Sequence, residues 1–142
     1  MFSSAFASPR HGQRAGLSHL YRQVGVDTQA ATADPHGLVT MLFNGFAEAI
    51  AEARGALATG STQQKGNAIQ RAVRILEEGL RAGLDLKAGG SLAQDLDDLY
   101  AYLGMRLTVA NLRNDDDALA EVLRLIQPLA DAWKAIAPQV RR

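Results

Sequence analysis

Apolar side chains recur at every third or fourth position from residue 35 to about residue 137, which is the spacing of one face of an α-helix. The first stripe shows the pattern in full, with Leu38, Leu42, Phe46, Ile50, Ala53 and Leu57. No run of alternating apolar and polar residues competes for a β-strand. The pattern predicts four helices, over residues 35–58, 63–86, 91–112 and about 115–137.

Residues that begin or end helices lie between these stripes. Asp34 followed by Pro35 is typical of a helix N-terminus, because the aspartate side chain accepts a backbone N–H and proline suits the first turn. Glycines at position 60 and at positions 89 and 90 predict breaks between helices. We expect the other three helices to be capped at their N-termini by Ser61 or Thr62, by Ser91 and by Asn114.

Four helices of similar length joined by short loops run antiparallel to their neighbours along the chain, because only a shared core buries all four stripes. Residues 1–33 differ from the rest, since they are rich in Ser, Gly, Ala and Gln and carry one short apolar stripe, Leu17, Leu20, Tyr21 and Val24. We therefore predict an all-α fold: an antiparallel four-helix bundle over residues 34–142, preceded by a flexible head, residues 1–33, that contains a short extra helix.

Composition and charge narrow the functional classes. The 142 residues include fifteen Lys and Arg and fifteen Asp and Glu, so the chain lacks the basic excess that nucleic-acid binding requires. The chain has no cysteine, which excludes disulfides, thiolate metal sites and cysteine nucleophiles. We find no signal peptide and no apolar run of 18 residues, so we expect a cytoplasmic protein without a membrane span.

The sequence offers no set of residues for catalysis or metal binding. His11 and His19 lie in the head and His36 in the first turn of a helix, and none has an inward carboxylate three residues away. The acidic run from Asp95 to Asp98 is better explained as a solvated helix face than as a calcium loop, because Tyr100 stands where that loop needs glycine. We expect no catalytic residue, no metal and no cofactor.

The chain has more apolar surface than a bundle seam needs. A seam takes about three positions in seven, yet the first helix adds residues such as Val39, Met41 and Phe43. The third helix adds Tyr100, Tyr102, Met105 and Val109. These extra side chains either pack on the head and the core edge or form an exposed apolar groove for another protein chain. The pattern alone leaves both interpretations open.

Several segments resemble the FliS family of flagellar export chaperones. The similarity is strongest from Gly89 to Asp115, in Gly89-Gly90-Ser91-Leu92-Ala93, Leu96, Leu99-Tyr100, Tyr102-Leu103, Arg106-Leu107, Ala110-Asn111 and Asn114-Asp115. Tyr21, Thr32 to Pro35 and Leu38 to Gly45 resemble the opening of the family, and Trp133-Lys134 its end. Leucine periodicity alone would not place the tyrosines, arginine and asparagines at these positions.

This resemblance implies a helical bundle without enzymatic activity. It also implies cytoplasmic binding of the C-terminal segment of newly made flagellin, protection of that segment from early polymerisation, and delivery to the flagellar type III export apparatus. On this basis, Tyr21 and Val24 are expected to cap the cargo groove. The residues expected to line it are Leu42, Phe46, Ile50, Tyr100, Leu103, Arg106, Leu107, Ala110 and Asn111.

Two other functions stay open from the residues themselves. A small all-helical enzyme would need charged residues on the inward faces, where leucine, isoleucine, valine and alanine dominate. A structural or regulatory bundle that only oligomerises would use the surplus apolar surface for self-association. Whether the protein is a monomer or a homodimer does not follow from the sequence.

Overall fold

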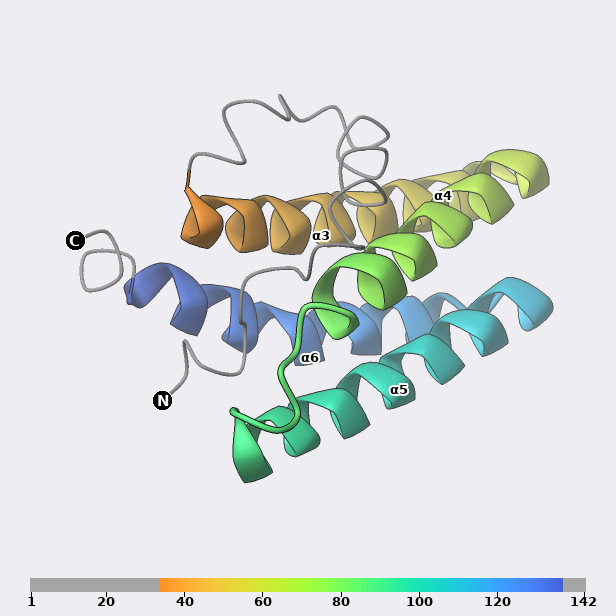
Figure 1. The fold of residues 1–142 in the computed structure, drawn as a ribbon. Coiled ribbons are helices and arrows are strands. Elements are labelled where there is room, and N and C mark those ends of the chain that lie inside the picture. The colour runs from red at the N-terminus through yellow and green to blue at the C-terminus, as the bar shows by residue number, and fades with distance from the viewer. Residues whose placement is uncertain (1–33, 137–142) are drawn as a thin grey trace.

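The computed structural model describes residues 34–136, which form four helical segments and no β-strand. Their bounds are α3, Pro35–Thr59; α4, Thr62–Arg74, continued by the π-helix η2, Ile75–Arg81; α5, Gly90–Arg113; and α6, Asp116–Ala135. Each segment runs opposite to the one before it (Figure 1). The predicted all-α bundle is confirmed. The expected head and its predicted short helix, including Tyr21 and Val24, lie outside the described residues.

Helix α3 begins and ends as its sequence predicts. The Asp34 side chain accepts the backbone N–H of His36 at 3.1 Å, and Pro35 occupies the first helical position. At the other end, Gly60 adopts a left-handed conformation with φ 76°, and its N–H donates to the carbonyl oxygens of Ala56 and Leu57 in the last turn. A residue without a side chain is favoured there, because left-handed backbone crowds a Cβ.

The second helix ends earlier than its leucine stripe predicts. After Arg74 the helix widens into η2, and it stops at Arg81 instead of near residue 86. The Ala82 N–H bonds the carbonyl of Glu77, five residues back, and a Cβ on Gly83 would stand 3.0 Å from the carbonyl oxygen of Gly79. Ile75, Leu76 and Leu80 of this π-helical segment are buried in the core. Glycine at position 83 allows the backbone to pass close to the Gly79 carbonyl where the helix has ended.

The caps of α5 and α6 differ from those expected. Helix α5 begins at Gly90 with Gly89 at its N-cap, so Ser91 lies inside the helix. Asn114 adopts a left-handed conformation, φ 52°, and closes the C-terminus of α5. The N-cap of α6 is therefore Asp115, whose carboxylate accepts the N–H of Ala118 at 3.3 Å. Ser61 does occupy the N-cap of α4, but its side chain makes no capping bond.

The core lies where the four stripes meet. Helix α3 packs against α4 and α6, while α5 packs against α6 and the η2 end of the second helix. This order places α3 and α5 diagonally across the bundle (Figure 1). The largest fully buried side chains are Tyr100, Phe43, Phe46, Ile50, Ile75, Leu76, Leu80, Leu103, Leu107 and Leu119. Among the described helices, none is both long and apolar enough to cross a membrane.

Candidate functional site

Seven of the residues expected to line a groove lie in the bundle core. Each has at most 3% of its surface exposed: Leu42, Phe46, Ile50, Tyr100, Leu103, Leu107 and Ala110. In this structure they hold the helices together and offer no open surface. The physical reason is that the inward stripe must bury itself before any surplus can serve a partner. Their contact with a partner stays a prediction.

Arg106 takes part in a polar link between α5 and α6. Its Nε donates to Glu121 Oε1 at 2.7 Å, and the Tyr102 hydroxyl donates to Glu121 Oε2 at 2.6 Å. The hydrogen bond from Tyr102, and then the one from Arg106, lower the pKa of the Glu121 carboxyl below its usual value. Glu121 is thus a charged acceptor that holds the Tyr102 ring and the Arg106 guanidinium in place.

Asn111 joins α5 to α4 through a buried lysine. Lys65 has only 4% of its surface exposed, and its Nζ donates to the backbone carbonyl oxygen of Asn111 at 2.8 Å and to its Oδ1 at 2.9 Å. A cation is favourable at this position, because the last turn of a helix carries unsatisfied carbonyls and the negative end of its dipole. Asn111 therefore has a structural role in this conformation.

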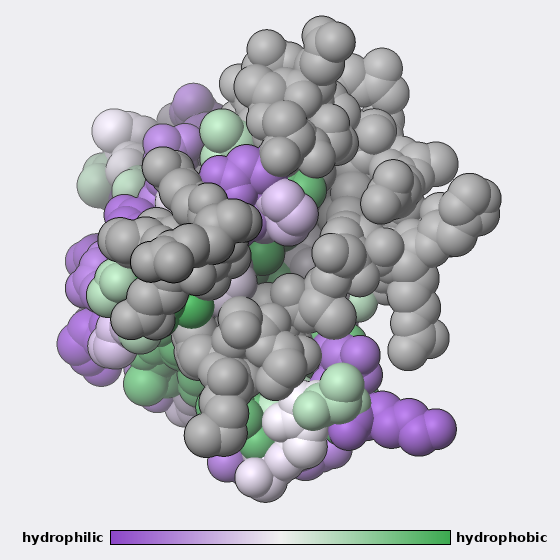
Figure 2. All heavy atoms as spheres, turned by 60° about the vertical axis from the view of Figure 1, so that its left-hand side comes forward, coloured by the Kyte–Doolittle hydropathy of each residue, from purple (hydrophilic) through white to green (hydrophobic). Residues whose placement is uncertain are grey.

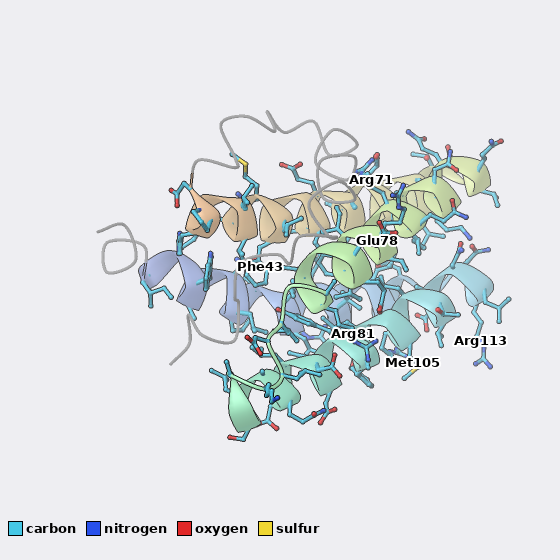
Figure 3. All side chains as sticks on the ribbon, viewed as in Figure 1. Phe43, Arg71, Glu78, Arg81, Met105 and Arg113 are labelled. Carbon is cyan, nitrogen blue, oxygen red and sulfur yellow. The ribbon has the colours of Figure 1, made fainter. Side chains whose placement is uncertain are left out.

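Helix α5 carries exposed apolar side chains on the side turned away from the core. Leu112 has 80% of its surface exposed, Met105 has 48% and Tyr102 has 39%. Ala101 is exposed and Val109 is half-buried. These five residues are called here the α5 face. Ala101 and Tyr102 are adjacent, and Met105, Val109 and Leu112 follow at intervals of three or four, so all five share one side of the helix. Met105 extends from the side of α5 turned away from α4 (Figure 3).

The α5 face is unusual for a surface helix. Normally the side opposite the core stripe is polar, and a helix that is apolar on every side is covered by something. The signal for it was present in the sequence, since Tyr102, Met105 and Val109 exceed the needs of a seam. Leu112 was missed, because it stands at the end of the predicted helix beside charged residues.

A groove of about 540 Å³ lies next to this face, between α4 and α5. Apolar and polar residues of both helices line it: Ile69, Gln70, Val73, Arg74, Thr108, Asn111 and Leu112. Leu112 belongs to both the groove and the α5 face, so the two form one continuous surface. On the side of the bundle shown in Figure 2, hydrophobic and hydrophilic atoms lie next to one another.

A second hollow, of about 660 Å³, lies where the α3–α4 and α5–α6 connections meet. Its charged groups are already paired. Arg54 Nε donates to Asp116 Oδ1 at 2.8 Å, and Arg54 Nη2 donates to Asp116 Oδ2 at 3.0 Å. This pairing lowers the pKa of the Asp116 carboxyl. The hollow therefore holds a structural ion pair between α3 and α6 and no free acid or base for catalysis.

The described residues hold no cluster of three or more His, Cys, Asp or Glu side chains that could bind a metal ion. The His36 side chain is bonded to α6, since its Nε2 donates to the backbone carbonyl oxygen of Trp133 at 2.7 Å. The imidazole of His36 also stacks on the indole of Trp133, with ring centroids 4.4 Å apart. His11 and His19 lie outside the described part of the chain. Among residues 34–136 the buried hydroxyl of Tyr100 has no hydrogen-bond partner. Burial raises the pKa of this hydroxyl, so it stays protonated at neutral pH.

Comparison with known proteins gives a consistent result. The family described as "Flagellar protein FliS" matches residues 17–140. The flagellar secretion chaperone FliS of Salmonella typhimurium is 44% identical over 84% of this chain and 88% of its own length, and that of Escherichia coli is 42% identical over 80% and 84%. FliSB of Pseudomonas aeruginosa is 40% identical over 82% and 92%. The chain therefore belongs to the FliS family of flagellar secretion chaperones and is not an enzyme.

Proposed function

We propose that this protein binds the C-terminal region of newly made flagellin in the cytoplasm, prevents its premature polymerisation and delivers it to the flagellar type III export apparatus. Membership of the FliS family supports the general role. The single observation that carries the binding step is the α5 face, since Met105 and Leu112 expose large apolar surfaces that no described helix covers.

The α5 face has the dimensions of a helix-binding surface. From Ala101 to Leu112 it extends over eleven residue steps, which is about 16 Å or three helical turns. A guest helix with apolar anchors at i, i+3 or i+4, and i+7 would place them along this length, with one edge in the groove between α4 and α5. Met105 suits such contacts, because its flexible thioether adapts to the shape of a partner.

The polar link at Glu121 supports this role by fixing the border of the face. Tyr102 would otherwise be free to rotate, but its hydroxyl is held by Glu121 at 2.6 Å. A ring held in place loses less conformational entropy when a guest packs on it. We therefore include Tyr102 and Arg106 among the residues that bind flagellin.

Calorimetric titration of the full chain with a flagellin C-terminal peptide tests the binding step. A large negative heat-capacity change is expected, because apolar area is buried. Replacing both Met105 and Leu112 by aspartate should weaken binding about tenfold or more, since central apolar anchors each contribute over about 1 kcal/mol. Leu86→Asp is the matched control, because Leu86 is 49% exposed but lies before α5 begins. Unchanged binding by the double variant would refute this site.

The head forms a separate part of the proposal. We expect Tyr21 and Val24 to cover the cargo groove in the free protein, as the family resemblance implies. Deleting residues 1–25 should then raise the affinity for the flagellin peptide, since no segment has to be displaced. An affinity that falls on deletion would show that the head contributes contacts to cargo instead.

Self-association is the alternative use of the same surface. An α5 face that meets a second copy would also bury Met105 and Leu112. Light scattering of the isolated protein distinguishes the two functions. A monomer that changes mass only when the flagellin peptide is added supports the chaperone, whereas a stable dimer that the Leu112→Asp substitution dissociates supports self-association.

A further inference from the structure

The two ends of the α5 face carry opposite charges. Asp95 and Asp98 are exposed just before Ala101, and Arg113 is exposed just after Leu112. Arg113 extends from the same side of α5 as Met105 (Figure 3). Asp98 accepts a hydrogen bond from Gln94 at 3.0 Å, but neither aspartate nor Arg113 has an ion pair within residues 34–136. The charges are therefore available to a guest.

The acids near Arg113 are directed elsewhere. Asp115 caps the first turn of α6 through the N–H of Ala118. Asp116 forms the ion pair with Arg54 on α3, and the charge of Asp117 also raises the pKa of Arg54. Within residues 34–136, none of these carboxylates forms an ion pair with Arg113.

We propose, on the basis of the function proposed above, that the guest is an amphipathic helix that lies antiparallel to α5. Its first turn carries Asp or Glu beside Arg113, and its last turn carries Lys or Arg beside Asp95 and Asp98. Three apolar anchors between them pack on Tyr102, Met105 and Leu112. The charged turns lie about 22 Å apart, since Arg113 is fifteen residue steps after Asp98 along the helix.

Three electrostatic effects favour this direction over the reverse. Antiparallel helices place their opposite dipole ends side by side. The guest helix is also most stable by itself with acids in its first turn and bases in its last turn. Only the antiparallel direction brings those same acids to Arg113 and those same bases to Asp95 and Asp98. In the parallel direction a guest with this stable pattern would meet like charges at both ends.

Paramagnetic relaxation measures the direction. A nitroxide is attached to the N-terminus of the shortest flagellin C-terminal peptide that binds, and amide signals of the full chain are recorded. Stronger broadening at Leu112 and Arg113 than at Asp98 and Ala101 is expected. Stronger broadening at the Asp98 end would overturn the proposal, although the chaperone function would stand. If no flagellin C-terminal peptide binds the full chain, the proposed function on which this inference rests is refuted instead.

Charge reversal tests the chemistry of the guest. Arg113→Glu and Asp98→Lys should each weaken binding of the same peptide about two- to fivefold at low salt, the size expected for exposed ion pairs. The difference should disappear near 1 M salt, where charges are screened within about 3 Å. Glu48→Lys is the matched control, because Glu48 is exposed on α3 and has no ion pair within residues 34–136. Equal affinities for all three variants would overturn the charge assignment.

Discussion

Helices α3 and α5 both carry more apolar residues than a bundle seam requires, but they place the surplus differently. On α3 the extra side chains are covered: Phe43 is 1% exposed, and Val39 and Met41 are partly buried against the core. On α5, Met105 and Leu112 are left 48% and 80% exposed. Surplus apolar residues therefore do not by themselves identify a binding surface, because coverage depends on neighbours from other parts of the chain.

The strongest test of this difference compares the core of α3 with the α5 face. Phe46→Ala should lower the free energy of unfolding by about 3–5 kcal/mol, because it leaves a cavity at a fully buried position. Met105→Ala should change it by less than about 0.5 kcal/mol, since the side chain is half exposed. Urea unfolding followed by circular dichroism measures both. A comparable loss in the two variants would mean that Met105 is part of the core.

A smaller loss of stability is expected from breaking the hydrogen bonds between Lys65 of α4 and Asn111 of α5. Lys65→Met keeps the length of the side chain but removes the two hydrogen bonds to Asn111. The carbonyl at the end of α5 is then left without its buried donor, so the free energy of unfolding should fall by about 1–3 kcal/mol. Urea unfolding again gives the value. Gln64→Met, one residue earlier on exposed surface, should have little effect, and equal losses would contradict the role of Lys65.

An increase in stability is expected in the exposed part of α3. A Cβ on Gly55 would meet no atom within 4 Å, and the residue lies inside the helix. Gly55→Ala should therefore raise the free energy of unfolding by about 0.5–1 kcal/mol, because alanine loses less backbone entropy. Gly104→Ala on α5 is the counterpart: its Cβ would stand 3.4 Å from Glu77 Oε2, so it should gain less. Thermal unfolding compares the two, and a larger gain at position 104 would be inconsistent with this packing.

The smallest effect concerns the pH dependence of the link between α5 and α6. The pKa of Glu121 is lowered in the folded protein from its ordinary value of 4.5, so its contribution to stability is complete above that value and is lost as pH falls through the folded pKa. The melting temperature of the wild type should exceed that of Glu121→Gln at pH 7, and the difference should shrink below about pH 4.5. A difference that stays constant down to pH 3 would show that the charge of Glu121 is not involved.

Much of the bundle followed from local patterns. The bounds of α3 agree with the prediction to within one residue, because its caps are local: the Asp34 side chain accepts the N–H of His36, and Gly60 adopts a left-handed conformation. The early end of the second helix could not be predicted in this way. Its stripe continues to Leu84 and gives no sign of the π-helical turn or of the close approach of Gly83 to the Gly79 carbonyl.

The sequence predicted an apolar surface on α5 but not which of its residues are exposed. The sequence indicated the helix that carries it and several surplus residues, including Tyr102 and Met105. It did not separate them from Tyr100 and Leu103, which the structure places in the core. The side chains of successive residues point in directions about 100° apart around the helix axis. A small rotation of the whole helix therefore decides which of them face inward.

The sequence by itself determined that this chain forms four helices, that they share one core and that it belongs to a family of flagellar secretion chaperones. Periodicity, capping chemistry and specific side chains are local properties that can be read along the chain. Only the tertiary structure decided which apolar side of α5 remains uncovered, that Lys65 ends buried at the last turn of α5, and that Glu121 joins two helices. These features depend on distances between residues far apart in sequence, which are set when the helices pack.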